Sequence, residues 1–299
     1  MLPAMANYVD KLQPAFTEAF SLAARGAADL AGHMSPDVEN LAGWLFGTNE
    51  AEAQRRLGNV QRIPATFSTN IRDLSNLNDV VVYCNMDRYQ TSNRPDGALY
   101  DPNTGSYLKL SEVDSMMCKT GQAIAGQRRP KAITANYPRW DTRKPPVLTT
   151  MDICNWYLEF VKSSQWATES DVESGSPTFP SLWGFLESLA TTHQETFGRT
   201  RMDISALFEH TLLHELTHSD KVGTPQYEIP EAESYGWDKC VEAKSATNSD
   251  SLAFFALGCQ FINQGYTIGS FGNIDSPSPS RENSPPRRRR TIVSRLWAS

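Results

Sequence analysis

The chain contains the sequence His-Glu-Leu-Thr-His at residues 214–218, and its spacing strongly constrains what this segment can form. Helix side chains at i and i+4 lie above one another, so His214 and His218 share one helix face. In helices of this pattern, two imidazoles one turn apart bind zinc, and the glutamate beside the first imidazole is the base that activates the zinc-bound water. The spacing predicts His214 and His218 as zinc ligands and Glu215 as the general base.

The flanking residues decide whether this short pattern lies on a helix. Upstream apolar residues recur at helical spacing, at Ile204, Leu207, Phe208, Leu212 and Leu216. Asp203 or Ser205 is expected to cap the start of the helix. Gly223 and Pro225 should end it within about a turn of His218. The motif is therefore expected on one helix that ends close behind it.

A catalytic zinc needs a third protein ligand and keeps one position open for water. That ligand must come from outside the motif helix. Glutamates follow shortly after, at Glu228, Glu231 and Glu233. A second helix is expected over residues 230–244, because Pro230 suits a first turn and acidic residues follow it. His210 adds another imidazole at i−4, but it lies about 12 Å from His218 along the helix, so we expect a structural role for it.

Several stretches resemble, in order, the deuterolysin-like (aspzincin) zinc endopeptidases, which include the peptidyl-Lys metalloendopeptidases. The stronger matches are Leu212–His218, Gly223–Thr224, Tyr235–Cys240 and Asn248–Phe255. The weaker matches are Trp44–Gly47 and Ile153–Trp156. The resemblance implies a zinc-dependent endopeptidase that acts on a protein or peptide substrate, with one Zn²⁺ per chain.

One departure from the family pattern concerns the third ligand. The resemblance implies an aspartate there, but the family's spacing falls on Gln226 or Ala232, neither of which binds zinc. Either a glutamate has replaced that aspartate or the site has lost its metal. We expect Glu231 as the ligand, because it would share a helix face with Tyr235 at i+4, and Glu233 is the alternative.

The resemblance also assigns two further residues. Tyr235 matches the catalytic tyrosine that stabilises the oxyanion, whereas the residues alone would suggest a core aromatic. Asp250 matches an aspartate that binds substrate. Ala253 occupies the position where lysine-specific members carry a glutamate, so strict lysine preference is not expected.

Two other functions stay open at this point. The first is a catalytically inactive binding module with the zincin fold that has lost the family's aspartate ligand. The second is a structural interaction protein whose function lies in its carboxyl-terminal tail. In each case we expect a monomer that binds no nucleic acid, because no aromatic residues interleave with the arginines of the tail.

The expected fold is α+β, a zincin-like fold that is mainly helical with a small sheet above the HExxH helix. One metallopeptidase domain is expected over residues 1–274, with a helical part at 1–75 and a catalytic part at 76–274. Helices are predicted at 5–32 (with a break at Pro14), 35–47 and 181–189. Strands are predicted at 80–84, on either side of the turn residues 97–105, at 134–137 and within 147–156.

Residues 275–299 form a Ser-, Pro- and Arg-rich tail whose composition predicts disorder. No apolar run is long enough to span a bilayer. The amino terminus lacks the pattern of a secretory signal, although the family is usually exported. A cytoplasmic branch, another export route and a non-native chain start all stay open. At least one of the five cysteines is unpaired, and we expect Cys154 and Cys240 to be buried free thiols.

Overall fold

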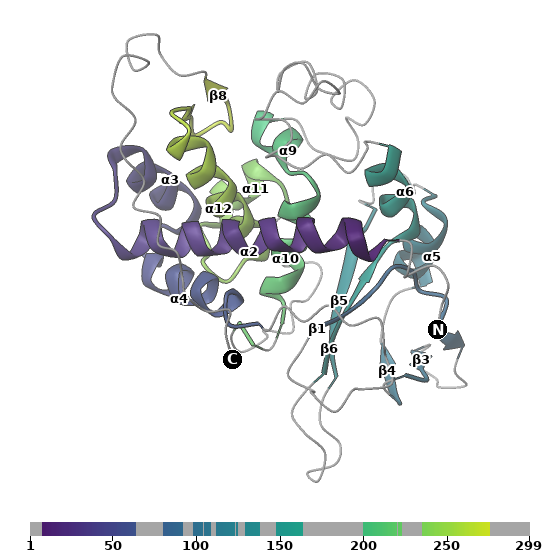
Figure 1. The fold of residues 1–299 in the computed structure, drawn as a ribbon. Helices are drawn as coiled ribbons and strands as arrows, with labels where there is room; N and C mark the ends of the chain where they lie inside the picture. Colours follow the sequence, from purple (N-terminus) through teal and green to yellow (C-terminus); the bar gives the residue numbers. More distant parts are fainter. Residues whose placement is uncertain are drawn as a thin grey trace.

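The computed structural model describes residues 8–63, 80–91, 98–103, 105–108, 112–122, 124, 129–137, 148–163, 200–219, 221–222 and 235–275. Helices dominate this part of the chain, and the strands form small sheets (Figure 1). The architecture is mixed and compatible with the α+β class. The predicted helix at 181–189 and residues 276–299 of the predicted tail lie outside the described residues. The predicted start of the tail was one residue too early, because Asp275 belongs to a strand, β8 (Ile274–Asp275).

Three helices begin the described chain: α2 (Val9–Ala31), α3 (Pro36–Phe46) and α4 (Glu50–Val60). The Ser35 side chain accepts a hydrogen bond from the backbone N–H of Val38 at the start of α3. Gly47, with φ +62°, ends that helix in a conformation that favours glycine. The predicted helix at 35–47 is therefore confirmed.

Pro14 does not break the first helix, so that prediction was wrong. The residue lies inside α2 and is exposed. A proline here removes one helical hydrogen bond, the one to the carbonyl of Asp10. Asp10 is also exposed, so water can take the place of the missing donor. Leu12 and Phe16 hold the same helix to the core, where each is at most 5% exposed.

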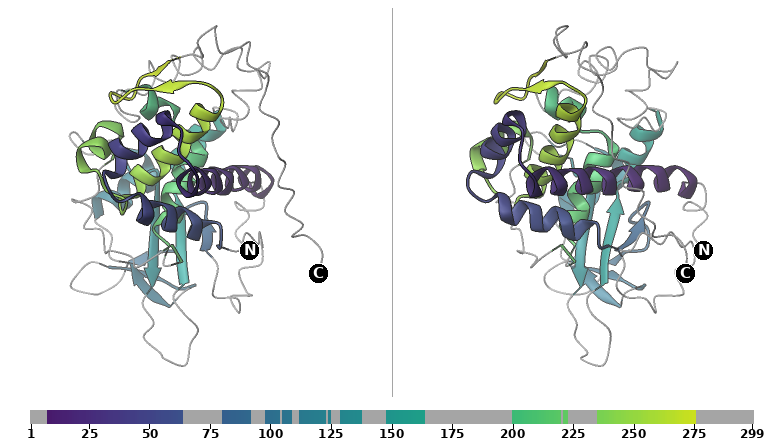
Figure 2. Two further views of the ribbon diagram at one scale, coloured as in Figure 1. Left: turned by 90° about the vertical axis from the view of Figure 1, so that its left-hand side faces the viewer. Right: turned by 60° about the vertical axis from the view of Figure 1, so that its left-hand side comes forward.

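The helical core forms around α10 (Phe208–Thr217) and α12 (Ser249–Asn263). Helix α2 packs against both and against α4, and it crosses in front of them in Figure 1. Helix α12 also packs on α3 at Gly258, where an added Cβ would lie 2.6 Å from the Cδ2 atom of Leu41. Figure 2 shows these helices gathered on one side of the central sheet.

The central sheet has the order β1-β6-β5, with β1 at Val80–Tyr83, β6 at Leu148–Ile153 and β5 at Ala132–Tyr137. Strand β1 runs parallel to β6, and β5 runs antiparallel to it. Among the described strands, β5 is therefore an edge, and it packs against α10. The strand predictions at 80–84 and 134–137 are confirmed. The strand predicted within 147–156 is confirmed as β6, and helix α6 (Asn155–Ser163) begins directly after it.

A second sheet and a hairpin complete the described strands. The second sheet contains β2 (Gln90–Thr91), β3 (Leu99–Asp101) and β4 (Ser106–Leu108), and β7 (Thr267–Ile268) pairs with β8 (Ile274–Asp275). A hairpin is found where the turn residues 97–105 predicted one, but the turn is shorter than predicted, because Leu99–Asp101 already forms β3.

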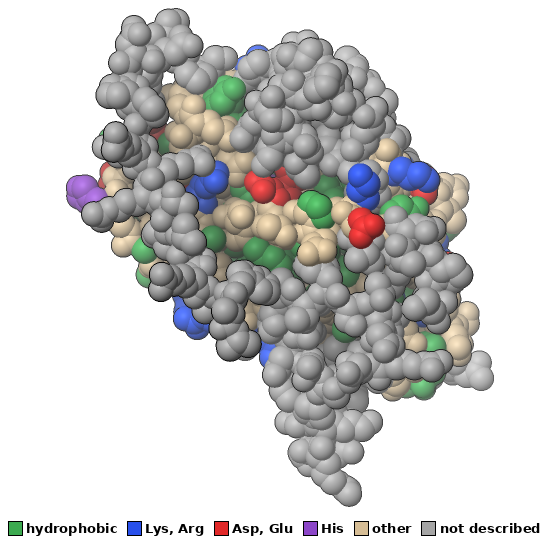
Figure 3. Space-filling view, viewed as in Figure 1, with side chains coloured by type: hydrophobic (Ala, Val, Ile, Leu, Met, Phe, Trp, Pro, Cys, Tyr) green, Lys and Arg blue, Asp and Glu red, His purple; other side chains and the backbone are tan. Residues whose placement is uncertain are grey.

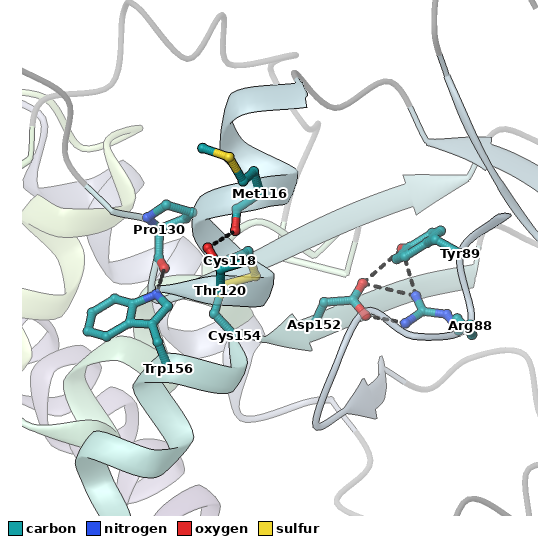
Figure 4. Close-up of a disulfide and its surroundings, with 9 residues drawn as sticks. All are labelled: Arg88, Tyr89, Met116, Cys118, Thr120, Pro130, Asp152, Cys154 and Trp156. Carbon is teal, nitrogen blue, oxygen red and sulfur yellow. Dashed lines mark hydrogen bonds and ion pairs between the residues drawn. A yellow bond between two sulfur atoms is a disulfide. The ribbon is translucent and has the colours of Figure 1, made fainter. Parts of the chain in front are cut away.

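A buried arginine links the two larger sheets. Arg88 donates hydrogen bonds from Nε to Asp101 (3.0 Å) and from Nη2 to Asp152 (2.9 Å). Its guanidinium also lies over the rings of Tyr83 and Tyr89. Figure 4 shows Asp152 facing Arg88 and Tyr89. Because Arg88, Asp101 and Asp152 are all buried, each charge depends on the others for its partner.

A disulfide joins Cys118 of α5 (Glu112–Thr120) to Cys154, directly after β6 (Figure 4). The expectation that Cys154 is a free thiol was wrong, because folding brings together two cysteines 36 residues apart. Cys240 is buried and forms no disulfide within the described residues, as expected, and the same holds for Cys84 and Cys259. Burial raises the pKa of Cys84 to about 11, which keeps that thiol protonated at neutral pH.

Two observations on the described residues concern a membrane and the distribution of surface charge. None of the described helices is both long enough and apolar enough to cross a bilayer. On the face drawn in Figure 3, basic and acidic side chains are interspersed over the described residues. That part of the surface therefore carries both signs of charge.

Candidate metal and catalytic site

Helix α10 is buried along its whole length. It packs against α2 and α12, and strand β5 lies against it. A helix buried on all sides is normally apolar, but α10 carries six polar or ionisable side chains. They are Glu209, His210, Thr211, His214, Glu215 and Thr217. Buried polar groups require hydrogen-bond partners, so the neighbours of this helix determine what it can do.

The predicted start of this helix was wrong. Helix α10 begins at Phe208 without a side-chain cap. Asp203 and Ser205 belong to a separate short helix, α9 (Arg201–Ser205), where Asp203 forms a capping box with Thr200. The apolar spacing seen in the sequence therefore runs across two helices. The end agrees with the prediction, because the last helical residue is Thr217.

The two motif histidines face each other as their spacing predicted. The Nε2 atom of His214 lies 3.1 Å from the Nε2 atom of His218. Two nitrogens bound at about 2.0–2.1 Å to a tetrahedral zinc are roughly 3.3 Å apart, so this donor pair suits zinc with little movement. On the other side of the second ring, the Nδ1 atom of His218 lies 3.5 Å from Ser249 Oγ. Zinc binding itself stays a prediction.

Asp250, on the first turn of α12, fixes the orientation of the first histidine. Its Oδ1 atom lies 2.9 Å from His214 Nδ1, and its Oδ2 atom accepts a 2.6 Å hydrogen bond from the N–H of Gly236. Burial alone would raise the pKa of Asp250. The hydrogen bond and positive charge of His214, the charge of His210 and the Gly236 N–H together hold that pKa well below its usual value. A carboxylate on Nδ1 leaves Nε2 of His214 available to a metal.

Strand β5 contacts the other half of the motif through two polar side chains. Thr134 Oγ1 donates a 2.6 Å hydrogen bond to Glu215 Oε2. Asn136 Nδ2 donates a 2.8 Å bond to the backbone carbonyl of His218. The sequence analysis did not identify either residue. Their i, i+2 alternation within a predicted strand was the available signal, because it places both on one face of the sheet.

Tyr235 lies beside His214. The two rings are stacked with their centroids 5.6 Å apart, and Tyr235 is 42% exposed. It is not helical, however, which corrects the helix predicted over 230–244. Helix α11 spans Trp237–Ala243, and Gly236 before it has φ +86°. The i+4 argument for Glu231 requires Tyr235 to be part of a helix, so it does not hold.

A carboxylate from another helix also holds the Tyr235 segment. Asp203 Oδ1 accepts a 2.8 Å hydrogen bond from the N–H of Trp237. Asp250 holds the N–H of Gly236, so carboxylates accept from two consecutive backbone donors. The sequence analysis assigned Asp203 to a different helix and missed this role. We conclude that the position of Tyr235 over His214 is fixed from two sides.

The third ligand falls outside the described residues. Glu228, Glu231 and Glu233 all lie within residues 223–234, as do Gln226 and Ala232. Within the part of the chain that is described, no three metal-binding side chains converge. His210 points elsewhere on the helix, and its ring packs 4.5 Å from that of Phe254, in agreement with a structural role. A glutamate ligand from residues 228–233 stays a prediction.

Comparison of the chain with protein-family models, with curated proteins and with solved structures found no match. The family resemblance therefore stays a prediction from the ordered sequence motifs. Support for a function comes from the distances around His214, Glu215 and His218 given above.

Proposed function

We propose that the chain is a zinc-dependent endopeptidase with a zincin-like fold. The observation that carries this proposal is the pair of imidazole nitrogens 3.1 Å apart, on a helix where the carboxylate of the next residue, Glu215, is held by Thr134. His214, His218 and one glutamate of residues 228–233 would hold the metal. When bound, zinc would polarise the attacking water and the scissile carbonyl. The donor set of two histidines and a glutamate is common among HExxH enzymes.

Glu215 moves the proton in this proposal. It takes a proton from the attacking water as the water oxygen bonds to the carbonyl carbon. It then gives that proton to the amine nitrogen as the C–N bond breaks. Thr134 holds Oε2 of Glu215, so Oε1 is the oxygen left for the proton. The hydroxyl of Tyr235, on an exposed ring stacked on His214, would donate to the oxyanion.

The register of β5 suggests where a peptide would lie. The N–H of Cys154 donates to the carbonyl of Lys131, one step beyond the Ala132–Ile153 pair. Hydrogen-bonded and non-hydrogen-bonded pairs alternate in antiparallel strands, so the backbone groups of Ala132 and Thr134 point away from β6. An extended peptide can add to such an edge as a further strand. This edge brings its backbone next to Glu215.

A competing interpretation needs no metal. One neutral imidazole can donate its N–H to the other across the same 3.1 Å, and the fold would then serve as a binding module. Elemental analysis of the purified chain separates the two proposals. We expect about one zinc per chain, removable by a chelator, together with peptide hydrolysis that returns when zinc is added back.

Variants of the motif test the assigned roles. Glu215→Gln should keep zinc but lower kcat by several orders of magnitude, because proton transfer and water orientation are both lost. Glu209→Gln is the matched control, since Glu209 is a buried glutamate of the same helix. His214→Ala and His218→Ala should lose the metal. Full activity in Glu215→Gln would refute the mechanism.

The third ligand requires its own series. Glu228→Gln, Glu231→Gln and Glu233→Gln are made singly, and zinc content is measured for each. We expect one of the three to lose zinc and the other two to keep it. If all three keep it, the assigned ligand set is wrong. A wild-type chain that binds no zinc would favour the binding module.

A further inference from the structure

Thr134 has two roles near the candidate site, one for its side chain and one for its backbone. Its hydroxyl donates a 2.6 Å hydrogen bond to Glu215 Oε2 and lies 3.3 Å from the Glu215 carbonyl oxygen. Its backbone N–H and C=O point away from β6 by the alternation described above, toward the side on which β5 is an edge among the described strands. The same residue therefore contacts the proposed base through its side chain and the proposed peptide position through its backbone.

The hydroxyl has a fixed direction because of its position in the sheet. Thr134 lies opposite Met151 of β6, which is fully buried. Threonine is stiff about χ1, so a strand that cannot shift also holds the hydroxyl in place. A hydrogen bond to a carboxylate is short and about twice as strong as one between neutral groups. The Thr134 hydroxyl thus holds the Oε2 atom of Glu215, and this also fixes the direction of the Oε1 atom.

We propose that Thr134 is a positioning residue for Glu215 and couples peptide pairing at the β5 edge to the orientation of the base. This inference rests on the proposed peptidase function. A peptide that pairs with the Thr134 backbone holds the strand, and the strand holds the hydroxyl against Glu215. Loss of the hydroxyl removes the contact between the strand and Glu215 but keeps the backbone groups that would pair with the peptide.

The kinetic test uses substitutions that keep the strand. Thr134→Val retains the branched shape and the backbone groups, so KM should stay within about threefold while kcat falls on the order of 10²-fold, as for a misplaced catalytic group. Thr134→Ser should restore most of kcat, because it returns the hydroxyl. Thr150→Val is the matched control. Thr150 is a fully buried threonine of β6 whose hydroxyl has no hydrogen-bond partner within the described chain. Zinc content should stay at about one per chain in all these variants.

A second measurement needs neither zinc nor activity. In chelator-treated protein, the urea midpoint is measured for Thr134→Val, Glu215→Ala and the double variant. Groups in contact give non-additive effects, so Thr134→Val should lower the midpoint in the wild-type background and much less in the Glu215→Ala background. Equal shifts in both backgrounds would show that the two side chains do not act together and would overturn the inference.

The outcomes separate this inference from the function on which it rests. A wild-type chain without zinc and without hydrolysis overturns the peptidase proposal, and the positioning role with it. An active wild-type chain with an equally active Thr134→Val variant overturns the positioning role alone. Loss of zinc in Thr134→Val also overturns it, because the residue would then maintain the site as a whole.

Discussion

Replacing Asp250 with asparagine should weaken zinc binding by about 10–100-fold, the usual effect of removing a carboxylate behind a metal-binding histidine. Each carboxylate oxygen of Asp250 accepts from a different donor: Oδ1 is 2.9 Å from His214 Nδ1 and Oδ2 is 2.6 Å from the Gly236 nitrogen. Asparagine has one acceptor oxygen. Its amide NH₂ group must therefore face one of these two donors, whichever way the side chain is turned.

The expected loss follows from that mismatch. A 10–100-fold change in affinity corresponds to roughly 1.4–2.8 kcal/mol at about 1.4 kcal/mol per tenfold. The zinc-free protein should also lose about 1.5–3 kcal/mol of unfolding free energy, because a buried hydrogen bond to a charged group is broken. Asp250 is 6% exposed, so water can compensate little of this loss.

Zinc affinity is measured by competition with a chelating indicator, and stability by urea unfolding of the chelator-treated protein. Ser249→Ala is the neighbouring control, because Ser249 Oγ lies 3.5 Å from His218 Nδ1 and should matter little. A zinc Kd for Asp250→Asn within twofold of the wild type would refute the reasoning. It would show that Asp250 does not determine how His214 presents its Nε2 atom.

Two further predictions concern stability. Replacing Cys118 and Cys154 together with serine should lower the unfolding free energy by about 4 kcal/mol, because the bridge closes a loop between cysteines 36 residues apart. A reductant should lower the melting temperature of the wild type but not of this variant. A wild-type melting temperature that does not change with reductant would contradict the bridge. Arg88→Ala should cost about 3–5 kcal/mol, because it leaves two buried carboxylates without their cation. Arg55→Ala removes an exposed ion pair and should cost less than about 1 kcal/mol. Denaturant titration measures the unfolding free energy of both arginine variants, and equal losses in the two would contradict the argument from burial.

The sequence could predict the parts of the site that depend on residues within one helical turn. The facing of His214 and His218 follows from i, i+4 spacing, and both the end of α10 and the cap of α3 follow from nearby residues. The hydrogen-bond partners could not be predicted in this way. Thr134 is 81 residues from Glu215, and Asp250 is 36 residues from His214. The fold brings these distant residues together, and spacing within a single helix or strand does not reveal such contacts.

The errors have physical reasons of the same kind. Apolar spacing continued through Ala206 and Leu207, so two helices looked like one and Asp203 was assigned as a cap for the wrong helix. Gly236 can occupy helical and left-handed conformations alike, and its φ of +86° is set by carboxylates from two distant elements. The pattern of a glycine alone does not reveal which conformation tertiary contacts will select.

The buried polar side chains of α10 are more typical of a functional site than of a helix that only packs in the core. An apolar helix at this central position would pack without the desolvation that buried polar groups require. Instead, Asp250 of α12 lies at Nδ1 of His214, on the side of the ring away from Nε2, and the Thr134 hydroxyl of β5 donates to Glu215. Polar groups that break a local rule and are then compensated by separate elements are typical of functional sites. The Nε2 atoms of the two histidines face each other across 3.1 Å, and Nε2 is the atom through which each histidine would bind a metal in the proposed peptidase.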